Sequence, residues 1–174
     1  MEDKGNTVVK QGIDMAVPMA LYTTAISLMW IYVDKVPALS YLMLAMLLGG
    51  PVLLYYLQRR FFKMSNSTLG MWDLWRMGVV TIFFGTVFTL LVTYCFYEYV
   101  RPDYIYIQMQ NAIDIYRSTP GAESNEMANA LETMLAQDNV PSSWAMALSM
   151  FFITNISGML MGLFTSMLAS RKSH

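Results

Sequence analysis

Reactive side chains are scarce in this sequence. It has one cysteine, Cys95, and one histidine, His174, which is the last of 174 residues. The usual zinc and haem sites and most acid–base catalysis need a well-placed Cys or His, and a disulfide within the chain needs two cysteines. We therefore predict no catalytic residue, no cofactor and no metal site. An intramembrane enzyme stays open as a third hypothesis, because folding can bring distant groups together.

Methionine is the abundant metal-ligating residue, with 17 copies. Its soft thioether suits Cu(I), and the sets Met146/Met150 and Met159/Met161/Met167 are the ones that copper would use. Methionine is also a flexible apolar filler of packed helices. We favour this second interpretation, with these side chains facing lipid.

The composition indicates an integral membrane protein. The chain is 56% hydrophobic and 13% charged, about half of the roughly 25% charge of a soluble domain, and its mean hydropathy is +0.41. A net charge of −1 provides no field that would attract nucleic acid. The lipid bilayer is therefore the expected partner.

Four apolar runs are long enough to span a membrane, which takes about 20 residues. They cover about 13–33, 36–57, 77–97 and 144–169. The first run is longer than the apolar region of a signal peptide and contains Pro18, so we predict a retained span. The expected fold is all-α, with four transmembrane helices in a single membrane domain over 1–174. None of the 11 basic and 12 acidic residues lies in the middle of a predicted span, which argues against a proton-coupled pump.

Basic residues predict the orientation, because they are enriched on the cytoplasmic side. One side of the predicted topology holds eight of them: Lys4, Lys10, Arg59, Arg60, Lys63, Arg76, Arg171 and Lys172. The other side holds three: Lys35, Arg101 and Arg117. Both termini are therefore expected in the cytoplasm.

The segment of about 98–143 is the one sizeable part outside the spans. Apolar residues recur at helical spacing on both sides of the turn Thr119-Pro120-Gly121. The first set is Ile105, Met109, Ala112, Ile113 and Tyr116, and the second is Met127, Leu131, Met134 and Leu135. We predict an extracytoplasmic amphipathic helical hairpin between spans three and four.

Arg59, Arg60 and Lys63 flank Phe61 and Phe62 at the predicted end of span two. Basic residues beside aromatic residues at a membrane edge suit anionic lipid headgroups, so these three are candidate headgroup ligands. Simple topological anchoring is the other interpretation. Residues 69–76 are expected to form a short interfacial helix that leads into span three.

Two features within the predicted spans could build a site. Gly49-Gly50-Pro51 interrupts span two, and broken helices can line a solute site, although such kinks are also ordinary in membrane helices. Span four carries small residues spaced by four: Thr154, Gly158, Gly162, Ser166 and Ser170. Such a stripe lets another helix approach closely, and Asn155 beside it can hydrogen-bond across helices. Gly78, Thr81, Gly85 and Thr89 form a similar face on span three, so spans three and four are expected to pack together.

The order of these motifs resembles a known family. Leu69-Gly70-Met71-Trp72-Asp73-Leu74-Trp75-Arg76-Met77-Gly78 leads into span three, and Tyr97-Glu98-Tyr99-Val100-Arg101-Pro102-Asp103-Tyr104 ends it. An acid-rich helical segment and a glycine-rich last span with a basic tail follow. Nearly the whole chain is similar to small bacterial four-span proteins of unknown function. The resemblance implies the bacterial inner membrane and brings no reaction, substrate or site residue.

Two functional hypotheses follow from these features. The first is a non-enzymatic membrane protein that acts by helix-mediated assembly with a second copy or a membrane partner, through Thr154, Asn155, Gly158, Gly162 and Ser166. The alternative is a small carrier or channel for a neutral or lipidic solute, which Gly49-Gly50-Pro51 and Asn155 suggest. A lateral cleft between the helices would favour the alternative.

Overall fold

The computed structural model describes residues 4–65 and 69–171, and every regular element in these ranges is a helix. The chain is therefore all-helical over its described part, as the sequence predicts. Lys172 and His174 lie outside the described residues. The chain divides into two compact units, residues 1–93 with 149–174 and residues 94–148, which are described separately.

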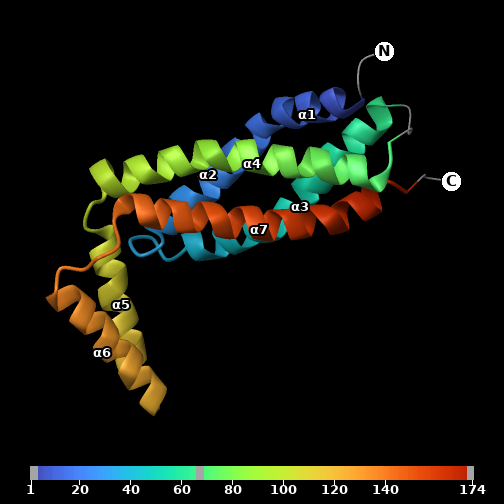
Figure 1. The fold of residues 1–174 in the computed structure, drawn as a ribbon. Helices are drawn as coiled ribbons and strands as arrows, with labels where there is room; N and C mark the ends of the chain where they lie inside the picture. Colours follow the sequence, from blue (N-terminus) through green and yellow to red (C-terminus); the bar gives the residue numbers. More distant parts are fainter. Residues whose placement is uncertain (1–3, 66–68, 172–174) are drawn as a thin grey trace. The chain divides into compact units, whose positions relative to one another are not determined.

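The helices follow one another with short connections (Figure 1). They are α1 (Lys4–Asp14), α2 (Ala16–Tyr32), α3 (Leu39–Met64), α4 (Met71–Cys95), a π-helical segment (Phe96–Val100), α5 (Tyr104–Ser118), α6 (Ala122–Ala136) and α7 (Ser143–Ala169).

Three helical stretches are long and apolar enough to cross a membrane: Leu39–Met64, Met71–Val100 and Ser143–Ala169. The predicted first span needs a correction. It is not one straight helix, because the chain breaks at Met15 and Ala16–Tyr32 follows Thr7–Asp14 at a bend of 41°. Pro18 accounts for the break, since it has no N–H to donate to the Asp14 carbonyl. The two pieces together make a fourth candidate span.

Two other helix ends differ from the predicted ones for a common reason. The second span was expected to end near residue 57, yet α3 continues to Met64 because Phe61 and Phe62 are buried on one side of it. The separate interfacial helix expected at 69–76 is absent from the described residues. Instead α4 runs unbroken from Met71, because Leu74 and Met77 are part of the same core.

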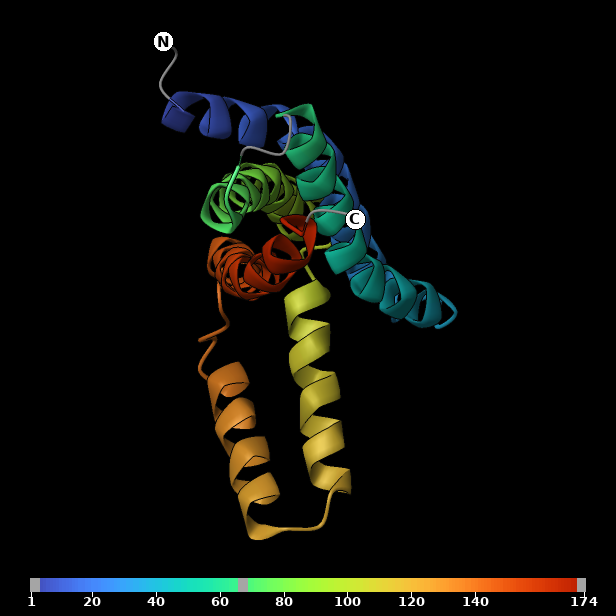
Figure 2. The ribbon, with the colours of Figure 1, turned by 90° about the vertical axis from the view of Figure 1, so that its right-hand side faces the viewer.

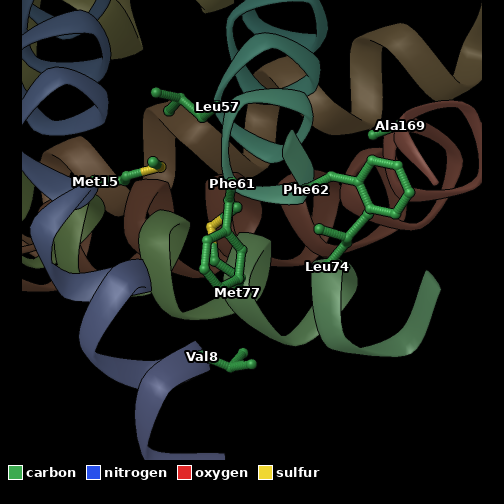
Figure 3. Packing of buried hydrophobic residues seen from close by; sticks show 8 residues of the cluster. All are labelled: Val8, Met15, Leu57, Phe61, Phe62, Leu74, Met77 and Ala169. Atoms are coloured by element: carbon green, nitrogen blue, oxygen red, sulfur yellow. The ribbon is translucent and has the colours of Figure 1, made fainter. Parts of the chain in front are cut away.

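This core joins four helices at one end of the first unit (Figure 3). Its buried members come from α1, the break after it, α3, α4 and α7: Val8, Met15, Leu57, Phe61, Phe62, Leu74, Met77 and Ala169. Arg59, Arg60 and Lys63 belong to the same part of α3, so we call this the basic end of the bundle. Burial of the aromatic residues holds the basic segment of α3 in helical form.

The N-terminal half of α3 is far less enclosed. Figure 2 shows this part of α3 extending away from α4 and α7. Its apolar side chains are exposed, with Tyr41 at 80% and Leu48 at 71% of their accessible surface. Large apolar residues that are exposed along a helix of membrane-spanning length are typical of surfaces that face lipid.

In the second unit, α5 and α6 lie side by side and run in opposite directions (Figure 2). Near their connecting turn, Arg117 pairs with Glu132, with Nη2 2.9 Å from Oε2. Ala128 is the fully buried residue of α6, while Met127, a member of the predicted apolar face, is 57% exposed. The small side chain of Ala128 lets the two helices approach closely.

Candidate functional site

A cleft of about 330 Å³ opens between α2, α3, α4 and α7. It lies within the first unit and is largely apolar, which is the usual character of small-molecule sites of about 300–1,000 Å³. Its lining is Met19, Tyr22, Thr23, Ile26, Leu47, Gly50, Pro51, Leu54, Ile82, Ile153, Thr154, Ser157, Gly158 and Met161. Gly50 and Pro51 of α3 and the stripe residues Thr154 and Gly158 of α7 therefore meet at one site.

Gly49-Gly50-Pro51 does not interrupt the second span, because α3 runs unbroken from Leu39 to Met64 with Pro51 inside it. The motif instead lets α2 approach the backbone of α3. Tyr22 donates a hydrogen bond from its hydroxyl to the Met46 carbonyl. A Cβ at Gly49 would lie 2.5 Å from that hydroxyl oxygen, whereas one at Gly50 would lie 3.8 Å from the nearest ring atom. Gly49 is therefore the residue that makes room for Tyr22. Pro51, which lacks an N–H, leaves the Leu47 carbonyl without its usual helical donor.

Tyr22 is a site residue that the sequence reasoning missed. Tyr and Trp concentrate at the ends of membrane helices, where their polar atoms meet water. Tyr22 instead lies near the middle of its apolar run and is half-buried. Its position in the middle of a span could have identified it from the sequence, because a tyrosine hydroxyl there must find a hydrogen-bond partner inside the bundle.

A cluster of threonine hydroxyls forms the polar edge of the cleft. Thr23 and Thr24 on α2 both contact Thr89 on α4, with Oγ1···Oγ1 distances of 2.7 and 3.0 Å. Thr23 also lines the cleft. Hydroxyls that bond each other in an apolar interior can also exchange partners with a bound polar group, because each is both donor and acceptor.

The glycines of the α7 stripe contact other helices of the same chain. A Cβ at Gly158 would lie 2.9 Å from Ile82 Cγ2 on α4. At Gly162 the nearest atom would be Leu54 Cδ2 on α3, at 3.7 Å. Ser166 is fully buried, and Thr154 is exposed at the cleft. The large apolar residues of α7 that do not line the cleft are exposed, among them Phe152, Ile156, Leu160, Phe164 and Met167.

Asn155 joins α7 to α4. Its Nδ2 donates to Thr86 Oγ1 at 2.8 Å and to the Phe151 carbonyl of its own helix at 2.9 Å. Asn155 is 5% exposed, so the bond is formed in an apolar interior, where it links two helices. This role is structural, since Asn155 does not line the cleft.

Spans three and four pack together, but through a different face of α4 from the expected one. The contacts to α7 come from Trp75, Ile82 and Thr86. The small face of α4 meets the other helices instead: a Cβ at Gly85 would contact Ala20 and Met19 on α2, and one at Gly78 would contact Gln58 on α3. The small residues lie where α2 and α3 come close to α4.

Gln58 is a second residue that the sequence reasoning missed. It is fully buried between three helices. From α3, its Nε2 donates to Ser166 Oγ at 2.9 Å on α7 and to the Leu74 carbonyl at 3.3 Å on α4. A neutral polar residue next to an arginine looks like the edge of a span, and the sequence alone does not separate it from an exposed one.

The three predicted headgroup residues have different surroundings. Arg59 donates from Nη1 to the carbonyls of Ala169 at 2.8 Å and Arg171 at 2.6 Å. It therefore caps the C-terminus of α7, where carbonyls lack helical partners and the dipole favours a cation. This second role was not predicted. Arg60 and Lys63 are exposed and remain candidate headgroup ligands.

The described residues contain no group of three or more His, Cys, Asp and Glu side chains that could hold a metal ion. Cys95 is a free, exposed thiol. The polar groups of the cleft are hydroxyls, which suit hydrogen bonding to a neutral molecule.

The first unit thus defines a class: an all-helical protein with membrane-length apolar helices and a cleft between them. The chain belongs to the DUF4199 family, described as a protein of unknown function, whose model matches residues 10–171. No curated protein and no solved structure matches the chain.

Proposed function

We propose that this protein is a carrier for a neutral or lipidic molecule, which it holds in the cleft between α2, α3, α4 and α7. The observation that carries the proposal is the meeting of Gly50 and Pro51 of α3 with the Thr154–Gly158 part of α7 at one apolar hollow. The hollow has the size of a small-ligand site, and Thr23, Thr154 and Ser157 supply a few polar groups at its wall.

The proposal includes a topology. We place α1 with α2, α3, α4 with the π-helical segment, and α7 across the bacterial inner membrane, with both termini in the cytoplasm. The helix pair α5–α6 then forms an extracytoplasmic hairpin. The excess of basic residues near the basic end supports this orientation. Cysteine-accessibility labelling of Ser118→Cys and Arg60→Cys, each in a Cys95→Ser background, tests it from opposite sides of the membrane.

Filling the cleft tests the binding proposal. Ser157 lines the cleft, while Ile156 on the same helix faces outward and does not. The Ser157→Phe variant is expected to lose binding of a fluorescent diacylglycerol by the purified protein in mild detergent, and Ile156→Phe is expected to keep it. Equal binding by both variants, with each still folded, would contradict the proposal.

Assembly through the α7 stripe stays a prediction. Its glycines contact Ile82 and Leu54 within the chain, so no contact of the stripe favours a second copy over intrachain packing. The mass of the wild-type protein in a nanodisc tests assembly directly.

A further inference from the structure

A second hollow continues the α3–α7 side of the cleft toward the basic end. It has a volume of about 390 Å³ and is lined by Pro51, Val52 and Tyr55 of α3 and by Thr165 and Leu168 of α7. Pro51 lines both hollows. The two hollows therefore adjoin each other at Pro51 of α3.

On α7 the lining residues of both hollows fall on one helical face. Thr154, Ser157 and Met161 line the cleft, and Thr165 and Leu168 line the second hollow. Their spacing of three, four, four and three residues keeps them in register along the helix. At about 1.5 Å per residue this strip is about 21 Å long, more than half of a hydrocarbon core of about 30 Å. A strip of that length matches an extended acyl chain better than a compact solute.

On α3 the face of the second hollow continues into basic residues. Val52 and Tyr55 are followed at helical spacing by Arg59 and Lys63, which lie at i+7 and i+11 from Val52. Arg59 is committed to the carbonyls of α7. Lys63 is exposed, so its ammonium can bind an anion at the end of the apolar strip.

We propose that the ligand is a phospholipid with an anionic headgroup, with one acyl chain in the two hollows and the net negative charge of the headgroup at Lys63. This inference rests on the proposed function of the cleft and names its ligand. Charge complementarity selects an anionic lipid: an apolar strip of acyl-chain length ends at a cation on the same helix face. Lys63 distinguishes this ligand from a neutral lipid, which would gain less from the charge.

The test is the occupancy of added lipid on the intact protein, measured by native mass spectrometry from mild detergent. The probes are phosphatidylglycerol and phosphatidylcholine with identical acyl chains. We expect one tightly held lipid and preference for phosphatidylglycerol. Lys63→Gln should lower phosphatidylglycerol affinity about fivefold, the factor that corresponds to about 1 kcal/mol per basic residue near an anionic surface. It should lower phosphatidylcholine affinity less, because the choline group offsets the charge of the phosphate. Lys63→Arg should restore the preference.

Lys10→Gln is the matched control, because Lys10 is also exposed but lies on α1. Equal loss with Lys10→Gln and Lys63→Gln would overturn the site and leave only a diffuse charge effect. Equal binding of both lipids, still lost in Ser157→Phe, would overturn the anionic ligand and leave the proposed function standing. Binding of either lipid that is insensitive to Ser157→Phe would refute the proposed function itself.

Discussion

The Gln58 side chain on α3 donates to the Ser166 hydroxyl on α7, with Nε2 2.9 Å from Oγ. Both residues are fully buried, and Ser166 Oγ passes a hydrogen bond on to the Gly162 carbonyl at 2.6 Å. The pair therefore fixes the register of α3 against α7, one turn along α3 from the cleft residue Leu54 and two turns along α7 from the cleft residue Gly158.

We expect Ser166→Ala to destabilise the protein, because Gln58 then keeps only its longer bonds to carbonyls. A double-mutant cycle with Gln58→Leu should give a coupling free energy of about 0.6 kcal/mol and no more than about 1.7 kcal/mol, the range of hydrogen bonds between membrane helices. Unfolding in mixed micelles measures it. Thr165→Ala is the control, since Thr165 Oγ1 donates within α7. Zero coupling would show that the two side chains act independently.

Gly49 and Gly50 are expected to behave differently although they are neighbours. Gly49→Ala places a Cβ 2.5 Å from the Tyr22 hydroxyl oxygen, while Gly50→Ala makes an ordinary contact of 3.8 Å. Gly49→Ala should therefore break the bond from Tyr22 to the Met46 carbonyl and cost about 1 kcal/mol. Gly50→Ala should be neutral.

Adding Tyr22→Phe tests the reason for this difference. Removal of the hydroxyl also removes the clash, so Gly49→Ala should cost little in a Tyr22→Phe background. Thermal unfolding of the four single and double variants in one detergent measures this. An equal cost of Gly49→Ala in both backgrounds would show that the clash with the Tyr22 hydroxyl is not its cause, and helix propensity could not explain it either, because alanine favours a helix more than glycine does.

The spans are the part of the fold that the sequence predicts best, because length and apolar character are properties of a continuous run. The helix ends were predicted less well. Residues 58–64 look like the end of a span because they carry three basic side chains, yet Phe61 and Phe62 are buried and extend α3. Pro18 was visible in the sequence, but its effect is to end α1 four residues earlier, at Asp14.

The candidate site was predictable only in part, since a sequence shows which residues can pack closely but not what they meet. Gly158 was singled out from its spacing, whereas its partner Ile82 is 76 positions away and has no distinctive type. Tyr22 is placed at the site by its contact with α3, and Gln58 joins α3 to α4 and α7. The cleft is a property of four helices together, and no single run encodes it.

Arg117 is expected to hold α5 and α6 together near their turn. Its Nη2 lies 2.9 Å from Glu132 Oε2 and 2.7 Å from Asn129 Oδ1. Both Arg117 and Glu132 are more than two-fifths exposed, so Arg117→Ala should cost only about 0.2–1 kcal/mol. Added salt should reduce the difference in stability between Arg117→Ala and wild type, because it screens the ion pair.

Hydrogen exchange of the α6 amides checks this prediction. Faster exchange in Arg117→Ala at low salt, and convergence with wild type at high salt, is the expected result. Glu126→Gln, which changes another exposed acid of α6, should leave exchange unchanged. Identical exchange in all three proteins would mean that the apolar contact around Ala128 suffices.

Gly158 and Gly162 give the sharpest comparison on α7. A Cβ at Gly158 would lie 2.9 Å from Ile82 Cγ2 and 3.1 Å from Ile82 Cδ1, while at Gly162 the nearest atom would be 3.7 Å away. Gly158→Ala should therefore destabilise the protein by about 1–3 kcal/mol, as overpacking does. Gly162→Ala should have little effect.

Ile82→Ala removes the atoms that Gly158→Ala would meet. Each single change should lower the denaturant concentration at which the protein unfolds. The decrease in the double variant should be smaller than the sum of the two single decreases. Unfolding in mixed micelles measures these stabilities. The mass of each variant in a nanodisc reports its oligomeric state. An equal cost for Gly158→Ala and Gly162→Ala, together with dissociation of a native oligomer by both, would instead place the stripe between subunits. We expect Ile82→Ala to offset part of the cost of Gly158→Ala, because α7 approaches α4 of the same chain closely at Gly158 and Ile82.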